Sequence, residues 1–267
     1  MYRYLYEREM YTIARDMVRQ ALESFVDKST ASFASAIDLD GLIDLDLAEP
    51  SRALEPFNQA LEIRKALFGS EHPFIAFSLN NIALAYTEMG ELEKAHSTHE
   101  EAIRLRLQAN SDRIGNSYSN MSSLLLRMGK PDEAEEMLAR CPSLKDFTDE
   151  TFLSSGNPRF SGDMVLLSRI RLAQGKIEEA LRLASKALVF RQEVLGGRLK
   201  TCDSQYDVAS ILLKMSHVSP AKYANLFQFR RSITQFWRTR SRCDYGMTCV
   251  LIYAFLLADN YLKNSSR

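Results

Sequence analysis

The feature that most constrains this chain is a small residue that recurs at near-constant intervals. Alanine occupies this marker position in each copy, and the steps between successive markers are 39, 42, 39, 46 and 41 residues. The markers are Ala14, Ala53, Ala95, Ala134, Ala180 and Ala221. A period of this length is typical of repeat architectures, in which each unit packs mainly against its neighbours. The chain is therefore expected to be a stack of similar units.

Two further positions keep their distance from the marker. A turn residue lies five places before it, and a second small residue lies seven places after it. The turn residues are Ala48, Gly90, Gly129, Gly175 and Ser216. The second small residues are Ala21, Ala60, Ala102, Cys141 and Ala187, and Gln228 is the exception. Glycine suits the C-terminal cap of a helix, and two small residues on one helical face let a neighbouring helix approach closely. The pattern predicts about six helix pairs.

Segment boundaries follow from the same register. Residues 1–30 are expected to be a partial N-terminal repeat, and residues 31–243 a helical repeat array with a long loop at about 142–162. Residues 244–267 are expected to be an apolar helix with a short tail. Pro50, Pro73 and Pro131 are expected to open helices, where a missing N–H costs nothing. Pro56 lies further inside a helix and is expected to bend or delay it.

These positions carry a resemblance to a known family. Gly90 with Ala95 and Ala102 resembles the tetratricopeptide repeat (TPR), as does Gly175 with Ala180 and Ala187. The run from 69 to 83, GSEHPFIAFSLNNIA, is similar to the longer kinesin-light-chain variant, whose period exceeds the standard ~34 residues. The overall pattern also resembles the TPR regions of fungal STAND-type (NB-ARC) proteins, which have a nucleotide-binding domain upstream. No G-x-x-x-x-G-K-[ST] phosphate loop occurs in this sequence. The expected fold is an all-α, right-handed superhelical solenoid of antiparallel helix pairs.

Charge and composition weigh against several classes of partner. The chain has 34 basic and 34 acidic residues, so no overall field favours nucleic acid or an anionic membrane. Aromatic residues interleave the arginines of residues 230–242, but a helix with a solvated basic end is the preferred interpretation. The uncharged run 245–258 is shorter than the ~20 residues that span a bilayer, and self-association through it is left open. The N-terminus does not resemble a secretory signal and the four cysteines lack metal spacing, so we expect a cytoplasmic protein.

Catalysis and metal binding find little support in the sequence. His96 and His99 lie three apart on one predicted helix, yet no third ligand has a supporting spacing. His99 occupies the slot that holds Phe57 and Leu138 in neighbouring copies, which predicts a packed or hydrogen-bonded core histidine. We expect no cofactor, no metal and no catalytic residue.

A peptide-binding groove is the predicted functional surface. In TPR-like arrays the first helix of each unit lines the concave wall. The residues expected there are Asn80, Asn81, Asn116, Ser119, Asn120, Ser123, Arg127, Arg169 and Asp207. The kinesin-light-chain resemblance implies that Asn81 and Asn120 hold the backbone of an extended peptide, since a carboxamide both donates and accepts hydrogen bonds. Leu39 and Leu166 occupy the matching slot in other copies, so the series of asparagines is incomplete.

The expected function is therefore a non-enzymatic scaffold that binds a protein or peptide segment in its concave groove. One alternative is a regulatory or sensor module that works with a nucleotide-binding switch domain, or as an accessory factor of a biosynthetic or signalling pathway. A second alternative is that the polar residues of the first helices only solvate an exposed face.

Overall fold

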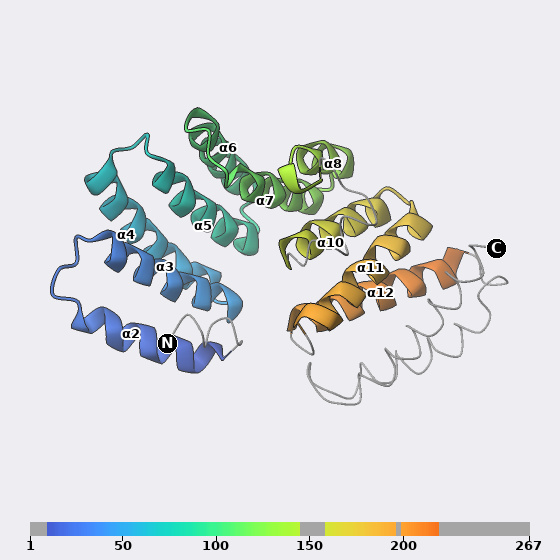
Figure 1. Cartoon of the computed structure of the whole chain (residues 1–267), viewed down its shortest axis with the longest axis horizontal. Coiled ribbons are helices and arrows are strands. Elements are labelled where there is room, and N and C mark those ends of the chain that lie inside the picture. Colours follow the sequence, from blue (N-terminus) through green and yellow to red (C-terminus); the bar gives the residue numbers. More distant parts are fainter. Residues whose placement is uncertain (1–9, 145–157, 196–198, 219–267) are drawn as a thin grey trace. The chain divides into compact units, whose positions relative to one another are not determined.

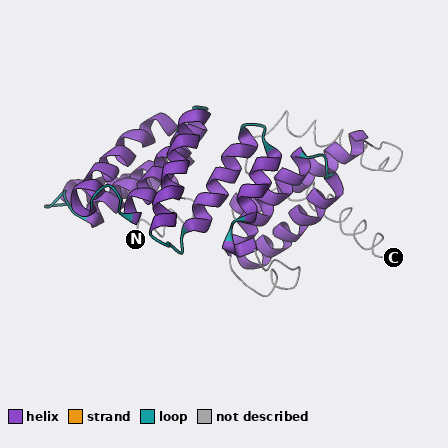
Figure 2. Cartoon of the chain, turned by 90° about the horizontal axis from the view of Figure 1, so that it is seen from above, coloured by secondary structure: helices purple, strands orange, loops and turns teal. Residues whose placement is uncertain are grey.

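The computed structural model describes residues 10–144, 158–195 and 199–218, and within these ranges the secondary structure is helical without a strand (Figures 1 and 2). Helix formation by nearly the whole described chain confirms the all-α prediction. The chain divides into two compact units, residues 1–142 and 143–267, and each is described by itself.

Unit 1 is a stack of helices joined by short turns, so that successive helices run antiparallel. Its helices are α2 (Tyr11–Ser24), α3 (Ala31–Asp46), α4 (Pro50–Phe68), α5 (Pro73–Met89), α6 (Leu92–Gln108), α7 (Ile114–Arg127) and α8 (Pro131–Ala139). Each helix packs against the next, and the pairs α3–α4, α5–α6 and α7–α8 are the predicted repeat units. The first helices α3, α5 and α7 also contact one another directly, and no two second helices of described unit 1 come comparably close. The first helices therefore form the inner, concave side of this stack.

A short 3₁₀ turn, Pro142–Leu144, contains the boundary between the two units. The helices of unit 2 are α10 (Pro158–Ala173), α11 (Ile177–Leu195) and α12 (Leu199–Val218). The pair α10–α11 surrounds Gly175, and α12 packs on α11 as the first helix of a further repeat. The TPR-like stack of antiparallel helix pairs is thus present in both units.

The small residues have the packing role that their register predicts. The markers Ala14, Ala53, Ala95, Ala134 and Ala180 have no exposed surface. The second small residues Ala60, Ala102, Cys141 and Ala187 are equally buried, whereas Ala21 is only half-buried. A methyl or thiol at these positions lets the neighbouring helix come close, so the repeat spacing directly encodes helix–helix contact.

The predicted turn residues end their helices in the left-handed conformation. The backbone φ is 61° at Ala48, 79° at Gly90, 76° at Gly129 and 78° at Gly175. These values confirm four of the five predicted turns, because a C-terminal cap of this kind requires φ > 0. The fifth is wrong, because Ser216 lies inside α12, which continues to Val218.

Two local predictions also need correction. Pro50, Pro73 and Pro131 open their helices as expected, but α4 runs from Pro50 through Pro56 to Phe68, so Pro56 does not delay it. The loop predicted to reach residue 162 is too long, because α10 already begins at Pro158. The marker Ala221, its exception Gln228 and the predictions for residues 230–242 and 244–267 lie outside the described residues.

Large apolar side chains fill the space that the small residues leave. In unit 1, Phe57 is fully buried, and its ring lies so close to Gly41 that an added Cβ there would meet it at 2.5 Å. Burial of a side chain of this size contributes roughly 2–3 kcal/mol. In unit 2 the core includes Leu181, Val208 and Ile211. None of the helices in the described ranges is long and apolar enough to cross a membrane.

Candidate peptide-binding groove

Asn81 lies at the seam between two first helices of unit 1. Its side chain projects from α5, and its Nδ2 donates a hydrogen bond to Oδ1 of Asp38 on α3 at 3.2 Å. The residue is buried, with 6 % of its surface exposed. The amide nitrogen is therefore committed to the protein, whereas no hydrogen bond from a described residue engages the amide oxygen.

Asn120 occupies the same place on the next first helix, α7, nine residues before the turn glycine. It is half-buried, as is Asn116 one turn earlier, while Ser123 one turn later is exposed. Arg127 is exposed at the end of α7, and its Nη1 pairs with Oε1 of Glu88 on α5 at 2.5 Å. These four residues of α7 present carboxamides, a hydroxyl and a paired guanidinium on successive turns.

Ser119 and Asn80 lie differently from the expectation. Ser119 Oγ lies 3.6 Å from the Cys141 thiol and is half-buried, so it faces the second helix side of the repeat. Asn80 is only 4 % exposed, and its Nδ2 donates to Ser117 Oγ at 3.1 Å. The prediction that Asn80 faces the groove does not hold, because its carboxamide joins α5 to α6 and α7 inside the stack.

His99 is the third member of that interior contact. Its Nδ1 lies 3.1 Å from Oδ1 of Asn80, and its side chain has no exposed surface. Burial, aided by the positive charges of His96 and Arg106, lowers the pKa of His99 to about 4. The prediction of a hydrogen-bonded core histidine is confirmed. The described residues contain no group of three ligand-type side chains that could hold a metal ion.

Unit 2 places its two predicted residues together. Arg169 on α10 binds Asp207 on α12 through both carboxylate oxygens, with Nε–Oδ1 at 3.0 Å and Nη2–Oδ2 at 2.9 Å. Burial raises the pKa of Asp207, and Arg169 opposes that rise. The pair links the two first helices of this unit, as the contact of Asn81 with Asp38 does in unit 1.

The sequence analysis missed a buried arginine in the second helix of three repeats. Arg64, Arg106 and Arg191 each lie eleven residues after their marker and are 4–7 % exposed. Each donates to the serine that lies twelve residues before the next turn position, at 2.5, 2.9 and 2.8 Å respectively. These serines are Ser78, Ser117 and Ser204. The constant offsets were visible in the sequence, but an arginine on a helix usually indicates a solvated position.

Arg64 also forms an ion pair with a buried acid. Its Nη2 lies 2.5 Å from Oδ2 of Asp38, and both side chains are less than a tenth exposed. Burial raises the pKa of Asp38, while Arg64 and the hydrogen bond from Asn81 lower it. Asp38 thus connects the interior pair to the seam asparagine, and the orientation of Asn81 depends on it.

Family models identify the repeats directly. Two tetratricopeptide-repeat models match, one over residues 41–108 and one over residues 115–141. No curated protein sequence matches the chain significantly.

Solved structures show the same fold at low sequence identity. Kinesin-light-chain TPR-like repeats from Podosopora anserina superpose with a TM-score of 0.52 at 17 % identity, covering 72 % of this chain and 92 % of that one. BtubC (BKLC) from P. vanneervenii gives 0.56 at 14 % identity, over 88 % and 94 % of the two chains. The Rap conjugation gene regulator of plasmid pLS20, in complex with the Phr* peptide, gives 0.65 at 13 % identity, over 100 % and 73 %.

The family models, the buried small residues at repeat spacing and these structural likenesses agree. The chain contains tetratricopeptide repeats, which the family models place at residues 41–108 and 115–141.

Proposed function

We propose that this chain is a non-enzymatic scaffold that binds an extended peptide segment along α5 and α7 on the concave side of unit 1. The observation that carries the proposal is the equivalent placement of Asn81 and Asn120 on two consecutive first helices. An extended peptide offers N–H and C=O groups at regular intervals, and carboxamides repeated along a wall match them.

The two asparagines differ in which hydrogen-bonding groups of their carboxamides are available to a peptide. Asn81 has its amide nitrogen bound to Asp38, so it offers the peptide an acceptor, which a backbone N–H would fill. No hydrogen bond from the described residues fixes the amide of Asn120, so Asn120 can offer both its donor and its acceptor. Asn116 and Ser123 lie one turn to either side of Asn120 and extend the polar wall along α7.

Further support comes from the fold. Tetratricopeptide repeats form protein-interaction scaffolds, and the Rap regulator to which this chain is similar was solved with a bound peptide. We also propose a cytoplasmic location, because the four cysteines of the sequence have neither metal-site spacing nor the density typical of disulfide-stabilised secreted proteins.

The test is a selection of linear peptides from a random display library on the full chain. Affinities of the enriched peptides are then measured for wild type and for Asn81→Ala and Asn120→Ala. Each substitution removes hydrogen bonds of about 1 kcal/mol and is expected to weaken binding roughly five- to tenfold. Ser97→Ala is the matched control, since Ser97 is exposed on the second helix α6 and bonds only within its own helix, to Lys94. Equal affinity for all four proteins would exclude the groove.

A further inference from the structure

The concave wall of unit 1 changes in character between two consecutive first helices. Four positions of α5 and of α7, at 13, 9, 6 and 2 residues before the turn glycine, lie on one side of their helix. On α5 they are Phe77, Asn81, Leu84 and Glu88, and on α7 they are Asn116, Asn120, Ser123 and Arg127. Asparagine occupies the second position in both helices, whereas the positions on either side of it are apolar on α5 and polar on α7.

The two apolar positions on α5 border Asn81. Phe77 lies one turn before Asn81 and Leu84 one turn after it, and both side chains are half-buried. The Phe77 ring lies over the buried guanidinium of Arg64, with 5.2 Å between its centroid and Cζ, and this contact holds the ring in place. Leu42, which occupies the Leu84 position on α3, is also half-buried. Such a surface stabilises a bound apolar side chain by removing it from water.

The matching positions on α7 are polar. Asn116 is half-buried and Ser123 is exposed. The ion pair between Glu88 and Arg127 joins the last turns of α5 and α7, with Oε1 and Nη1 2.5 Å apart. Because this contact aligns the two helices, the apolar positions of α5 lie beside the polar positions of α7. A ligand that crosses from α5 to α7 therefore passes from an apolar to a polar surface.

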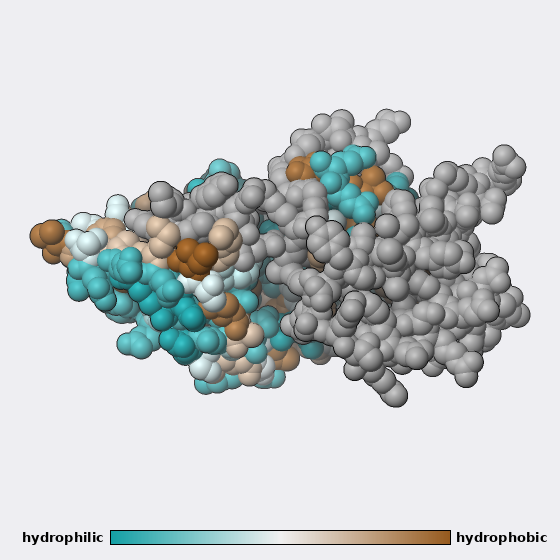
Figure 3. All heavy atoms as spheres, turned by 90° about the horizontal axis from the view of Figure 1, so that it is seen from below, coloured by the Kyte–Doolittle hydropathy of each residue, from teal (hydrophilic) through white to brown (hydrophobic). Residues whose placement is uncertain are grey.

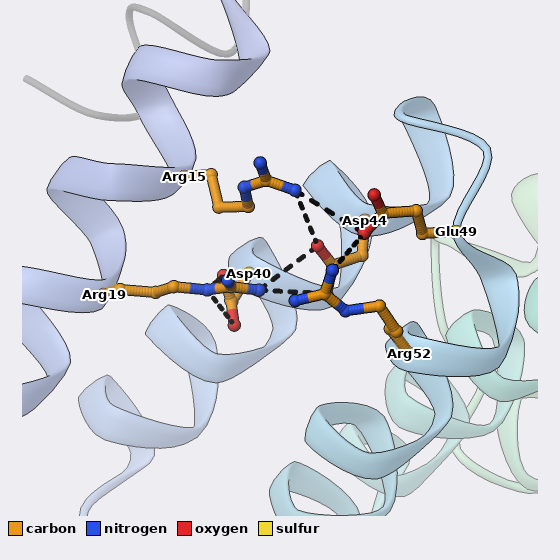
Figure 4. Close-up of polar contacts among 6 residues, drawn as sticks. All are labelled: Arg15, Arg19, Asp40, Asp44, Glu49 and Arg52. Atoms are coloured by element: carbon orange, nitrogen blue, oxygen red, sulfur yellow. Dashed lines mark hydrogen bonds and ion pairs between the residues drawn. The ribbon is translucent and has the colours of Figure 1, made fainter.

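A hollow of about 450 Å³ lined by α2, α3 and α4 is unlike this wall, because the protein's own ion pairs occupy it (Figure 4). Arg19 of α2 binds both Asp40 and Asp44 of α3, with Nε–Oδ1 at 3.0 Å and Nη2–Oδ2 at 3.2 Å. Arg15 and Glu49 extend the network towards α4. The described part of the face in Figure 3 is mostly hydrophilic, with separate apolar spots. These surfaces therefore offer no site comparable to the wall beside Asn81.

We propose that Phe77 and Leu84 determine the specificity of the groove by binding one large apolar side chain of the peptide. This inference rests on the proposed function and adds the class of ligand. The bound segment has a large aliphatic or aromatic residue over α5 and a polar residue over α7, where Asn116, Asn120 and Ser123 offer hydrogen-bonding groups.

The distance between the two helices sets the spacing of these residues in the ligand. The helices α5 and α7 contact each other directly. Packed helices lie about 8–10 Å apart, and an extended chain advances about 3.3 Å per residue. The apolar and the polar residue of the ligand are therefore about three positions apart.

The test uses peptides selected from a random display library on the full chain. On wild type, the enriched peptides should share a large apolar residue, and its replacement by serine should weaken binding at least about tenfold. The double variant Phe77→Asn/Leu84→Ser gives α5 the residues that α7 has at the matching positions. On this variant, the same replacement in the peptide should change the affinity by less than about threefold, because the apolar surface is gone.

The reciprocal variant, Asn116→Phe/Ser123→Leu, gives α7 the residues of α5. Selection on it should enrich peptides with a second large apolar residue about three positions from the first. Ser97→Leu is the control, because it adds an apolar side chain on the second helix α6 and should enrich no second apolar residue. The reciprocal variant decides the question alone if circular dichroism shows that Phe77→Asn/Leu84→Ser is unfolded.

The possible failures are distinguishable. Enriched peptides that depend on Asn120 but share no apolar position would overturn this inference and leave the groove intact. An apolar preference that persists unchanged in Phe77→Asn/Leu84→Ser would have the same meaning. Peptides that bind equally to wild type, Asn81→Ala and Asn120→Ala would overturn the proposed function and this inference together.

Discussion

At the scale of single residues, several buried polar side chains of unit 1 have specific partners on other helices, although Nε2 of His99 is buried without a hydrogen-bond partner. Asn80 joins His99 on α6 to Ser117 on α7. Asp38 receives Arg64 and Asn81. Buried polar groups of this kind are costly unless they are bonded, so each contact fixes how adjacent repeats meet.

His99 should make the stability of the protein depend on pH. Its pKa is about 4 in the folded chain and 6.5 in the unfolded one, so the unfolded state takes up a proton first as the pH falls. The stabilisation is complete above pH 6.5 and is lost between pH 6.5 and 4, with about 2 kcal/mol lost from pH 7 to pH 5. Urea unfolding at the two pH values measures this loss.

The control for that prediction is His99→Leu, which places in this slot the residue type found at Leu138. Ser117 Oγ still donates to Asn80 Oδ1 at 3.4 Å, so the carboxamide oxygen retains a partner. The variant should lose about 2 kcal/mol less than wild type on going to pH 5. An identical loss in both proteins would show that His99 does not carry the pH dependence.

Arg64 is predicted to stabilise the fold because it neutralises the buried carboxylate of Asp38. Arg64→Met leaves Asp38 buried without its cation, and we expect a loss of about 3–5 kcal/mol in the free energy of unfolding. The double variant Arg64→Met/Asp38→Leu removes both charges and should recover most of the loss. Arg104→Met is the matched control, since Arg104 is 40 % exposed and exposed ion pairs change the free energy of unfolding little. A double variant no more stable than Arg64→Met would contradict the pairing.

At the scale of elements, the helix ends follow directly from the sequence register. The turn position lies five residues before the marker, and in four repeats it has φ between 61° and 79°. Glycine reaches this region without strain, whereas the Cβ of alanine makes it unfavourable by about 1 kcal/mol. The left-handed conformation at Ala48 therefore lowers the stability of that repeat, relative to a glycine at the same position.

Exchange of residues at two turns tests this statement in both directions. Ala48→Gly should raise the free energy of unfolding by about 1 kcal/mol, and Gly90→Ala should lower it by a similar amount, since a Cβ at Gly90 meets no atom within 4 Å and only the backbone contributes. Gly162→Ala is the control, because Gly162 is exposed inside α10 without a positive φ, and there alanine should stabilise by about 1 kcal/mol. Thermal unfolding of the three variants measures the signs. A stabilising Gly90→Ala would rule out the left-handed cap.

The same register did not reveal which polar residues of a first helix face the groove. Asn80 and Asn81 are neighbours in sequence, and both are carboxamides. The helix rotates about 100° per residue, so a small error in the assumed packing face exchanges an interior position for a seam position. The side chain of Asn80 lies inside the stack because it bonds to His99 on α6 and Ser117 on α7. These two partners are 19 and 37 residues away in the sequence.

At the scale of the whole molecule, each unit contains its own core. The core clusters of the described residues draw their members from one unit or the other, with Phe57 and Leu105 in a cluster of unit 1 and Leu181 and Ile211 in one of unit 2. In a repeat stack, stability is roughly the sum of each repeat and its nearest-neighbour contacts. A cut between the units should therefore leave each core intact.

Residues 1–142 expressed alone should remain helical and keep the amide protection of α3 to α7 seen in the full chain. A cut after Gly90 is the comparison, because it removes α6 and with it Ala102 and Leu105 from the central cluster of unit 1. That shorter fragment should lose protection in α5. Hydrogen exchange followed by mass spectrometry distinguishes the fragments, and equal protection in both would argue against a core that is built repeat by repeat.

The sequence by itself determined the fold class, the repeat spacing, the helix ends at Ala48, Gly90, Gly129 and Gly175, and the buried small residues, because each of these depends on steric properties local to one helix or one turn. Only the tertiary structure decided that Arg64, Arg106 and Arg191 are interior, and that Asn80 bonds to His99 and Ser117 while Asn81 bonds to Asp38. These outcomes depend on which side chains from three different helices meet, and the burial of a charged or amide group is settled by the partners it finds there.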